Sequence, residues 1–315
     1  MQHQVDRSSD LVENPSRSVV AIRSHRPGPS VDRMYSWVRE AFSAENIFIV
    51  ADETSDKQYS WNSDYNVIAM NESFMDRNYL FSPGADVGWR CGDYCYLAVS
   101  EAVDFDFIWL IEPDVAANFK FDFLLSGVGD NDADLIGSSL RLRSSTWPWF
   151  KSMAELGHAE VHSVFFPLTR VSRELVGMIR DQRVEMSMSF RSGNQGLYPN
   201  DEAVTATTAI EGGFSTLNLQ DVFSDMFSHF RWGVKWLYPD VFENFDQPKM
   251  VHPAVDGSDY ARYLRKLISE SSSNRGLLDS LGASLWSVSA ANYYRWRGFV
   301  LSETGRWLDK SVFDR

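Results

Sequence analysis

Two carboxylates follow a short apolar segment about a third of the way along the chain. Residues 108–111 (Ile-Trp-Leu-Ile) are typical of a buried strand, and Glu112, Pro113 and Asp114 come directly after them. The carboxyl ends of strands in an α/β sheet are where such folds bind ligands. Carboxylate oxygens suit a hard divalent cation, whose coordination is completed by substrate phosphates. The segment therefore indicates a site for a cation and a phosphate-bearing compound.

Two further groups of polar residues follow in an order that such a site would use. Asp201 and Glu202 come after Pro199-Asn200 and open a predicted helix over 203–209, and His252 precedes a proline. The helix dipole favours an ionised carboxylate at a helix N-terminus, as a general base requires. Structural interpretations stay open beside these: the acidic pairs can form turns or cap the helix, and His252 can be a buried hydrogen-bonded side chain.

The elements around these residues alternate along the chain. Strands are predicted at 18–23, 46–51, 65–70, 108–111, 133–140 and 161–168, and helices between residues 34 and 42 and at 88–103 and 172–181. This alternation, with continuous apolar strands, predicts a mostly parallel central sheet of the α/β class with helices on both faces. We expect a flexible leader over residues 1–17, one α/β domain over 18–255 and a helical, aromatic-rich C-terminal extension over 256–315.

The composition limits the possible partners and compartment. The net charge of -13 in 315 residues disfavours nucleic acid, whose phosphates need clustered Lys and Arg. Cys91 and Cys95 lie in a predicted helix, where we expect reduced core residues. There is no apolar run near the ~20 residues of a membrane span and no signal-peptide pattern, which favours a cytoplasmic protein. The aromatic 286–296 segment either packs on the main domain or makes a peripheral contact with the inner face of the membrane.

The order of the three motifs resembles that of nucleotide-sugar-dependent glycosyltransferases of the GT-A fold, bacterial polysaccharide type. The resemblance covers roughly residues 18–255 and rests on the order of motifs and elements. In such enzymes an Asp-x-Asp motif at a strand end holds Mn or Mg on the donor diphosphate. A later acidic pair supplies the base, and a more C-terminal histidine can complete the metal site. Glu112 and Asp114 match the first motif, Asp201 and Glu202 the second, and His252 the third.

The resemblance implies further roles and includes one departure. Asp52, at the end of the second strand, lies where such enzymes contact the base or ribose of the donor, and Arg90 resembles a basic residue that faces the donor. Glu112 stands where the family has Asp, so Asp114 is the stronger metal ligand and Glu112 can instead contact the donor sugar. The implied activity is hexosyl transfer from a nucleotide-sugar to a hydroxyl of a glycan or lipid-linked glycan.

Other interpretations of the sequence stay open. A nucleotidyltransferase that makes sugar nucleotides would share the architecture, although residues 24–29 lack the repeated glycines of a phosphate loop. A non-catalytic glycan-binding domain would also use the aromatic residues. His158, Glu160 and His162 can form a zinc triad, but a solvated strand face is favoured. The Trp-Pro-Trp-Phe segment at 147–150 lines an acceptor groove or packs in the core.

Overall fold

The computed structural model describes residues 17–55, 59–84, 87–129, 131–193, 196–233, 235–271 and 296. A seven-stranded sheet with the order β3-β2-β1-β4-β7-β6-β8 lies at the centre of this part of the chain. The strands are β1 (Ser18–Ser24), β2 (Ile47–Asp52), β3 (Asn66–Met70), β4 (Phe107–Ile111), β6 (Leu135–Leu142), β7 (His162–Ser172) and β8 (Thr216–Asn218). Only β7 is antiparallel to its neighbours in this sheet, so the predicted mostly parallel α/β sheet is confirmed.

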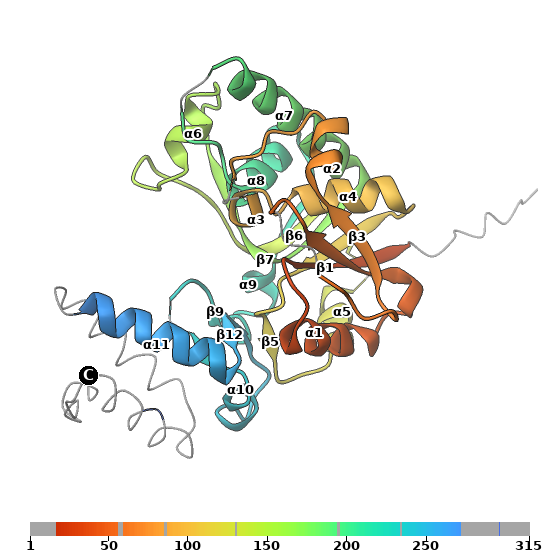
Figure 1. The fold of residues 1–315 in the computed structure, drawn as a ribbon, viewed down its shortest axis with the longest axis vertical. Coiled ribbons are helices and arrows are strands. Elements are labelled where there is room, and N and C mark those ends of the chain that lie inside the picture. The colour runs from red at the N-terminus through yellow and green to blue at the C-terminus, as the bar shows by residue number, and fades with distance from the viewer. Residues whose placement is uncertain are drawn as a thin grey trace, which may run out of the picture.

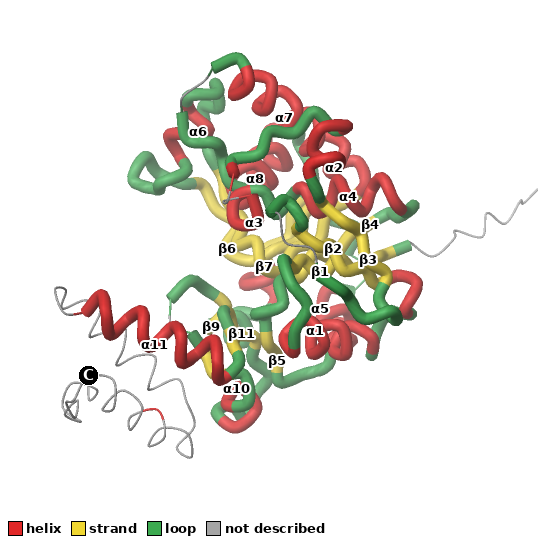
Figure 2. The backbone as a smooth tube through the Cα atoms, viewed as in Figure 1, coloured by secondary structure: helices red, strands yellow, loops and turns green. Residues whose placement is uncertain are grey.

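Helices cover both faces of the sheet (Figures 1 and 2). One face packs against α2 (Glu72–Arg77), α4 (Tyr94–Ala102), α7 (Arg173–Arg191) and α8 (Asp201–Glu211). The other packs against α1 (Pro29–Arg39), α5 (Phe121–Val128) and α9 (Leu219–Val222). Successive strand residues point to opposite faces, so a sheet buried on both sides needs the continuous apolar strands seen in the sequence.

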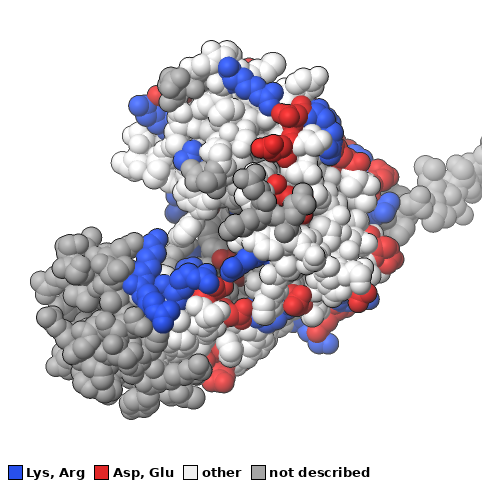
Figure 3. Space-filling model, in the orientation of Figure 1, with Lys and Arg blue, Asp and Glu red and all other residues white. Residues whose placement is uncertain are grey.

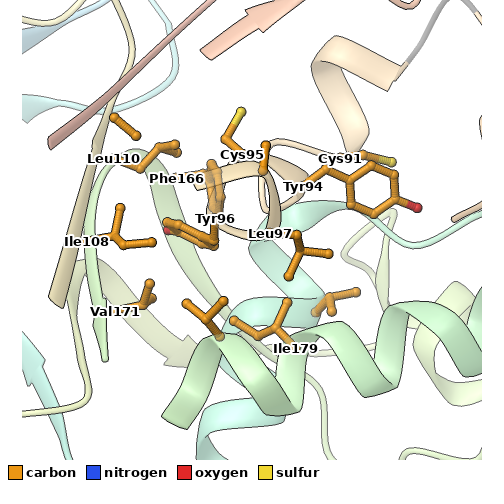
Figure 4. Close-up of a cluster of buried hydrophobic side chains, with 14 of the residues drawn as sticks. Cys91, Tyr94, Cys95, Tyr96, Leu97, Ile108, Leu110, Phe166, Val171 and Ile179 are labelled. Carbon is orange, nitrogen blue, oxygen red and sulfur yellow. The ribbon is translucent and has the colours of Figure 1, made fainter. Parts of the chain in front are cut away.

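The core between the sheet and α4 is rich in aromatic and sulfur-containing side chains (Figure 4). Cys91 and Cys95 are both free and buried, as expected from the sequence. The hydroxyl of Tyr96 forms a hydrogen bond with that of Thr169, so this buried polar atom is satisfied. Each large apolar side chain buried here stabilises the fold by about 1.5–3 kcal/mol, which anchors α4 against the strands that carry the acidic motif.

The single helix predicted over 88–103 is instead two helices, α3 (Val87–Arg90) and α4. In a continuous helix the N–H of Gly92 would donate to the carbonyl of Gly88. Here the Gly92 N–H donates to Oδ2 of Asp201 at 2.9 Å, and the Gly88 carbonyl accepts from the guanidinium of Arg23. Two side chains thus replace one helical hydrogen bond. The prediction was wrong because this exchange depends on residues that are distant in the sequence.

Short strands complete the fold beyond the carboxyl end of β4. β5 (Ala116–Ala117), β11 (Met250–His252) and β9 (His229–Phe230) form a three-stranded sheet in that order, and β10 (Trp236–Leu237) pairs with β12 (Ala254–Val255). The remaining elements are the 3-10 helix Ala44–Asn46, α6 (Phe150–Ala154) and α10 (Asp240–Glu243). The three-stranded sheet ties the chain after β4 to the C-terminal part of the domain.

The C-terminal extension begins with α11 (Gly257–Ser271), which agrees with the predicted helical character. The rest of that extension, apart from Trp296, lies outside the described residues, as do residues 1–16 of the predicted leader. Residues 286–295 of the segment with the proposed membrane contact fall there too. None of the helices in the described ranges combines the length and the apolar character needed to cross a bilayer.

Candidate functional site

Three of the predicted site residues converge at the carboxyl end of β4. Glu112 and Asp114 lie in the turn after this strand, and His252 is the last residue of β11. β11 runs antiparallel to β5, with Val251 opposite Ala116, and the N–H of Ala254 donates to the Asp114 carbonyl at 2.6 Å. Because β5 begins two residues after Asp114, this pairing brings the distant histidine beside the acidic motif.

The geometry of this triad suits a divalent cation. Glu112, Asp114 and His252 each offer one ligand atom, and these three atoms lie within 4.8 Å of one another. No other group of three His, Cys, Asp or Glu residues in the described ranges comes as close together. Nε2 of His252 lies 3.4 Å from Oδ1 of Asp114 and 3.9 Å from Oε2 of Glu112. Oδ1 of Asp114 is buried and receives no hydrogen bond within the described part of the chain. A cation would satisfy that oxygen, and two carboxylates with an imidazole fit Mn²⁺ or Mg²⁺ that also binds phosphates.

Aromatic packing orients the His252 ring. The centroids of Phe165, Phe230 and Trp232 lie 5.1, 5.9 and 6.4 Å from that of His252, all with edge-type geometry. Its Nδ1 atom is buried without a hydrogen-bond partner among the described residues. Packing, rather than a second hydrogen bond, therefore holds Nε2 toward the carboxylates. Trp232 is itself 64% exposed, so one of these rings is also presented to solvent beside the triad.

The triad is electrostatically coupled. Burial raises the pKa of Glu112, and nearby Asp114 adds to the rise, although Arg23 opposes it. Burial also acts to raise the pKa of Asp114, but the facing His252 outweighs it and the net pKa is lowered. Burial would lower the pKa of His252, but Asp114 holds it above its ordinary value. Each of these two groups thus favours the charged form of the other, and a cation that binds there would compete with a proton for Nε2 of His252.

The second acidic pair opens α8, as the sequence predicted. Oδ1 of Asn200 accepts from the N–H of Ala203 at 3.1 Å and caps the helix. Oδ2 of Asp201 accepts from Gly92 N at 2.9 Å, and Oδ1 accepts from Glu202 N at 2.8 Å. Both oxygens of the buried Asp201 are therefore engaged, whereas Glu202 keeps part of its side chain exposed. Of the two, Glu202 is the one that a substrate can reach.

The pKa values of the acidic pair differ from the expectation based on the helix dipole. Burial raises the pKa of Asp201 to about 6, although Arg23 opposes the rise. Burial, together with the charge of Asp201, raises the pKa of Glu202 to about 8, against the opposing effect of Arg143. The expectation that the dipole keeps Glu202 ionised was wrong, because desolvation outweighs the dipole at this buried helix end.

Arg23 is the site residue that the sequence analysis missed. It is the second-last residue of β1, and its side chain is 12% exposed. Nη1 lies 3.2 Å from Oε1 of Glu112 and 3.3 Å from Oδ2 of Asp201, so the guanidinium of Arg23 joins the two acidic motifs. Burial would lower the pKa of Arg23, but these two carboxylates raise it above its ordinary value. The only signal in the sequence was an arginine that ends an otherwise apolar strand.

The two residues assigned to the donor nucleotide lie near this centre but differ in their contacts. Asp52 ends β2, accepts from the hydroxyl of Thr54 at 2.6 Å, and faces Gly88, where a Cβ would lie 2.5 Å from Oδ2. The Arg90 guanidinium carbon lies 5.4 Å from the ring centre of Trp149. Asp52 therefore lies on the same sheet edge as the carboxylates, while the described ring contact of Arg90 is with Trp149. Their roles toward a donor stay predictions.

The alternative metal site and the aromatic loop have other contacts. Nδ1 of His158 lies 2.8 Å from Glu211, and Nε2 of His162 lies 3.6 Å from Glu160, so the two histidines have separate acidic neighbours. Trp149 is buried in the core on the α4 side, and Trp147 is only partly buried against it. The core interpretation therefore describes Trp149, while Trp147 keeps a surface that can meet a ligand.

A hollow lies between the part of the molecule that carries α6 to α8 and the part that carries α11, with Lys and Arg side chains along the α11 edge (Figure 3). Asp259 of α11 pairs with Arg26 at 3.6 Å and with Arg262 at 2.8 Å. A separate cavity of about 520 Å³ lies beside Pro113, with Trp37, Phe119, Tyr238 and Phe242 in its wall. Its lining includes none of the carboxylates described above, so side-chain chemistry rather than cavity size defines the site.

The chain was compared with known proteins. No family model matches it, and neither does any curated protein. A CMP:2-keto-3-deoxy-manno-octonic acid synthetase in complex with CTP is similar in structure at 11% identity and a TM-score of 0.35, covering 64% of this chain and 90% of that one. A mannosyltransferase from Pyrobaculum calidifontis in complex with GDP-Man and Mn2+ has 11% identity and a TM-score of 0.36, covering 96% and 89%.

A third similar structure is the apo form of the glycosyltransferase GlyE from Streptococcus pneumoniae TIGR4. It has 11% identity and a TM-score of 0.32, and the match covers 76% of this chain and 54% of that one. At such identities and scores these likenesses assign no activity to the chain. The function must be inferred from the residues of the site.

Proposed function

We propose that this protein transfers a sugar from a nucleotide-sugar donor to a hydroxyl of a glycan or lipid-linked glycan, with the help of Mn²⁺ or Mg²⁺. The observation that carries the proposal is the convergence of the Glu112–Asp114–His252 triad and the α8 acidic pair through Arg23. A cation site for a diphosphate and a carboxylate for an acceptor hydroxyl are the two functions that glycosyl transfer requires.

The triad would hold the cation by Oδ1 of Asp114, Oε2 of Glu112 and Nε2 of His252. A bound cation supplies charge stabilisation of the leaving diphosphate, which is worth several kcal/mol. Asp52, at the end of β2 on the same edge of the sheet, is proposed to bind the base or ribose of the donor, and Arg90 to contact the donor as well. These residues are proposed to orient the donor toward the acidic pair at the start of α8.

Glu202 is proposed as the base that takes the proton of the acceptor hydroxyl. Its side chain keeps an exposed portion, whereas both oxygens of Asp201 accept backbone hydrogen bonds. Asp201 would therefore position the start of α8 and the glycine turn before α4 rather than take the proton. A direct attack assisted by such a base inverts the anomeric centre.

A thermal-shift screen with UDP-, GDP-, CDP- and dTDP-sugars, with and without Mn²⁺, tests the proposal. Ligands that bind the folded state raise the melting temperature, so at least one donor is expected to do so only with the metal. A response to nucleoside triphosphates with sugar phosphates would favour a nucleotidyltransferase instead. A response to oligosaccharides but to no nucleotide would favour a glycan-binding domain and overturn the proposal.

The variant Asp114→Ala tests the metal assignment. We expect it to lose the Mn²⁺-dependent shift and to lower the metal-dependent release of nucleoside diphosphate by at least about 100-fold, which corresponds to about 2.7 kcal/mol. Asp181→Ala, on an exposed part of α7, is the matched control and should behave as the wild type. Equal loss in both variants, or none in either, would contradict the assignment of Asp114.

A further inference from the structure

We propose that Arg23 is a positioning residue that gives separate tasks to the partly buried Glu112 and the buried Asp201: Glu112 offers one oxygen to the cation, and Asp201 is held away from the acceptor. This inference rests on the function proposed above. The described contacts of Arg23 are with Glu112, Asp201 and the Gly88 carbonyl, and none is with His252. It acts through the acids that it holds.

The first task concerns Glu112. Its Oε1 is the oxygen paired with Nη1 of Arg23 at 3.2 Å, while Oε2 is the one that faces His252 at 3.9 Å. The positive charge beside Oε1 makes that oxygen the poorer metal ligand, which leaves Oε2 as the oxygen that Glu112 offers to a metal. This explains how a glutamate serves at a position where a shorter aspartate would be expected: its extra length reaches both the arginine and the cation position.

The second task concerns Asp201 and the turn before α4. Arg23 donates to the Gly88 carbonyl and pairs with Asp201, which in turn accepts from the Gly92 N–H. A Cβ on Gly92 would overlap Nη1 of Arg23 and would lie 2.6 Å from Oδ2 of Asp201, so the guanidinium is held in a closely fitted space. Because Asp201 is fixed in this way, Glu202 alone remains available to a substrate.

The arrangement has an electrostatic consequence for metal binding. A fixed positive charge 3.2 Å from a metal ligand repels a divalent cation. Free Mn²⁺ should therefore bind weakly, and the negative charge of a nucleoside diphosphate should strengthen its binding. Replacing Arg23 by a neutral side chain removes the repulsion and frees the second oxygen of Glu112. The sign of this effect is opposite to that of a residue that only maintains the fold, whose loss would weaken metal binding.

Titrations of the full chain with Mn²⁺, followed by electron paramagnetic resonance of the free ion, test the proposal. They are run with the metal alone and with UDP, GDP, CDP and dTDP. We expect Arg23→Met to bind free Mn²⁺ at least about tenfold more tightly than the wild type. The diphosphate should increase the Mn²⁺ affinity of this variant by a smaller factor than it does for the wild type. Arg23→Lys, which keeps the charge, should restore weak binding of the free metal.

Arg170→Met is the matched control, because Arg170 is another buried strand arginine, held by the carbonyls of Asn131 and Ala133 and by aromatic rings. Its Mn²⁺ affinity should equal that of the wild type. If Arg23→Met does not fold, the double variant Arg23→Met/Asp201→Asn replaces it, because it does not leave Asp201 buried as an unpaired charge. The same increase in affinity for free Mn²⁺ is expected of the double variant.

Unchanged or weaker Mn²⁺ binding in folded Arg23 variants, while the wild type binds Mn²⁺ with a diphosphate, would overturn the role of Arg23 alone. If the wild type binds Mn²⁺ neither alone nor with any of the four diphosphates, the proposed function fails and the inference fails with it. The two failures are therefore distinguishable in one set of titrations.

Discussion

At the scale of single residues, the proton on Glu202 should control the reaction. A base works only when deprotonated, and burial raises the pKa of this carboxyl to about 8. We therefore expect the metal-dependent release of nucleoside diphosphate to rise as the pH passes through about 8. In Glu202→Gln the rate should fall by about 10²–10⁴-fold and lose this rise. The measurement is a pH–rate profile with donor in excess.

Asp201→Asn provides the comparison for that profile. It keeps the size of the side chain and leaves Glu202 in place, so the rise with pH should remain, shifted to lower pH because a neighbouring negative charge is removed. A profile that rises in Glu202→Gln but is flat in Asp201→Asn would exchange the roles that we assign to the two acids.

The residues of the site were predictable from sequence to the extent that their chemistry is local. Glu112 and Asp114 follow an apolar strand, and Asp201 opens a helix, so each could be found from its neighbours in the chain. Arg23 could not, since its role comes from partners on α8 and in the turn after β4. The raised pKa of Glu202 also depends on tertiary burial, which no local pattern reports.

At the scale of elements, the glycine turn between α3 and α4 is a structural part of the site. An alanine at position 92 would force Arg23, Asp201 and Phe166 apart, since its Cβ would lie 2.7 Å from the ring of Phe166. We expect Gly92→Ala to lower the free energy of unfolding by about 1–3 kcal/mol, as overpacking does, and to weaken metal-dependent donor binding. Urea denaturation and the thermal-shift screen measure these two effects.

Gly177→Ala is a matched substitution within α7, where nothing lies within 4 Å of the added Cβ. It should increase the free energy of unfolding by about 0.5–1 kcal/mol, because alanine favours the helix interior over glycine. If both alanines had the same effect, the close fit around Arg23 would not be what constrains position 92.

The elements of the main sheet were largely predictable, while the ones that assemble the site were not. Continuous apolar runs predicted β1, β2, β4 and β7 to within a few residues. β5 and β11 have only two and three residues, too short for any periodicity to reveal, yet their pairing places His252 beside Asp114. The break of the helix at Gly92 likewise depends on hydrogen bonds from outside the segment.

At the scale of the whole molecule, the charge is distributed unevenly. The chain has 43 acidic and 30 basic residues, yet Lys and Arg gather along the α11 edge of the hollow in Figure 3. The candidate site, in contrast, contains carboxyl groups that are partly or fully buried. Buried carboxyl groups tie the stability of the entire fold to pH, because their proton affinities differ between the folded and unfolded states.

Glu202 determines the sign of that dependence. Its pKa rises from 4.5 in its ordinary state to about 8 in the folded protein, so the folded state holds its proton more tightly than the unfolded state does. The resulting stabilisation is fully present below pH 4.5 and is lost as the pH rises toward about 8. Asp201, with a pKa of about 6, adds a loss in the lower part of this window, and His252 adds one of the same sign.

We therefore expect the free energy of unfolding, measured with urea in metal-free buffer, to fall between about pH 5 and about pH 8.5. In Glu202→Gln the fall should be smaller, because the amide does not titrate, while the part that belongs to Asp201 and His252 should remain. The difference between wild type and variant should vanish below pH 4.5, where the Glu202 carboxyl is protonated in both the folded and the unfolded state. A variant whose stability falls as steeply as that of the wild type would show that folding does not raise the pKa of Glu202.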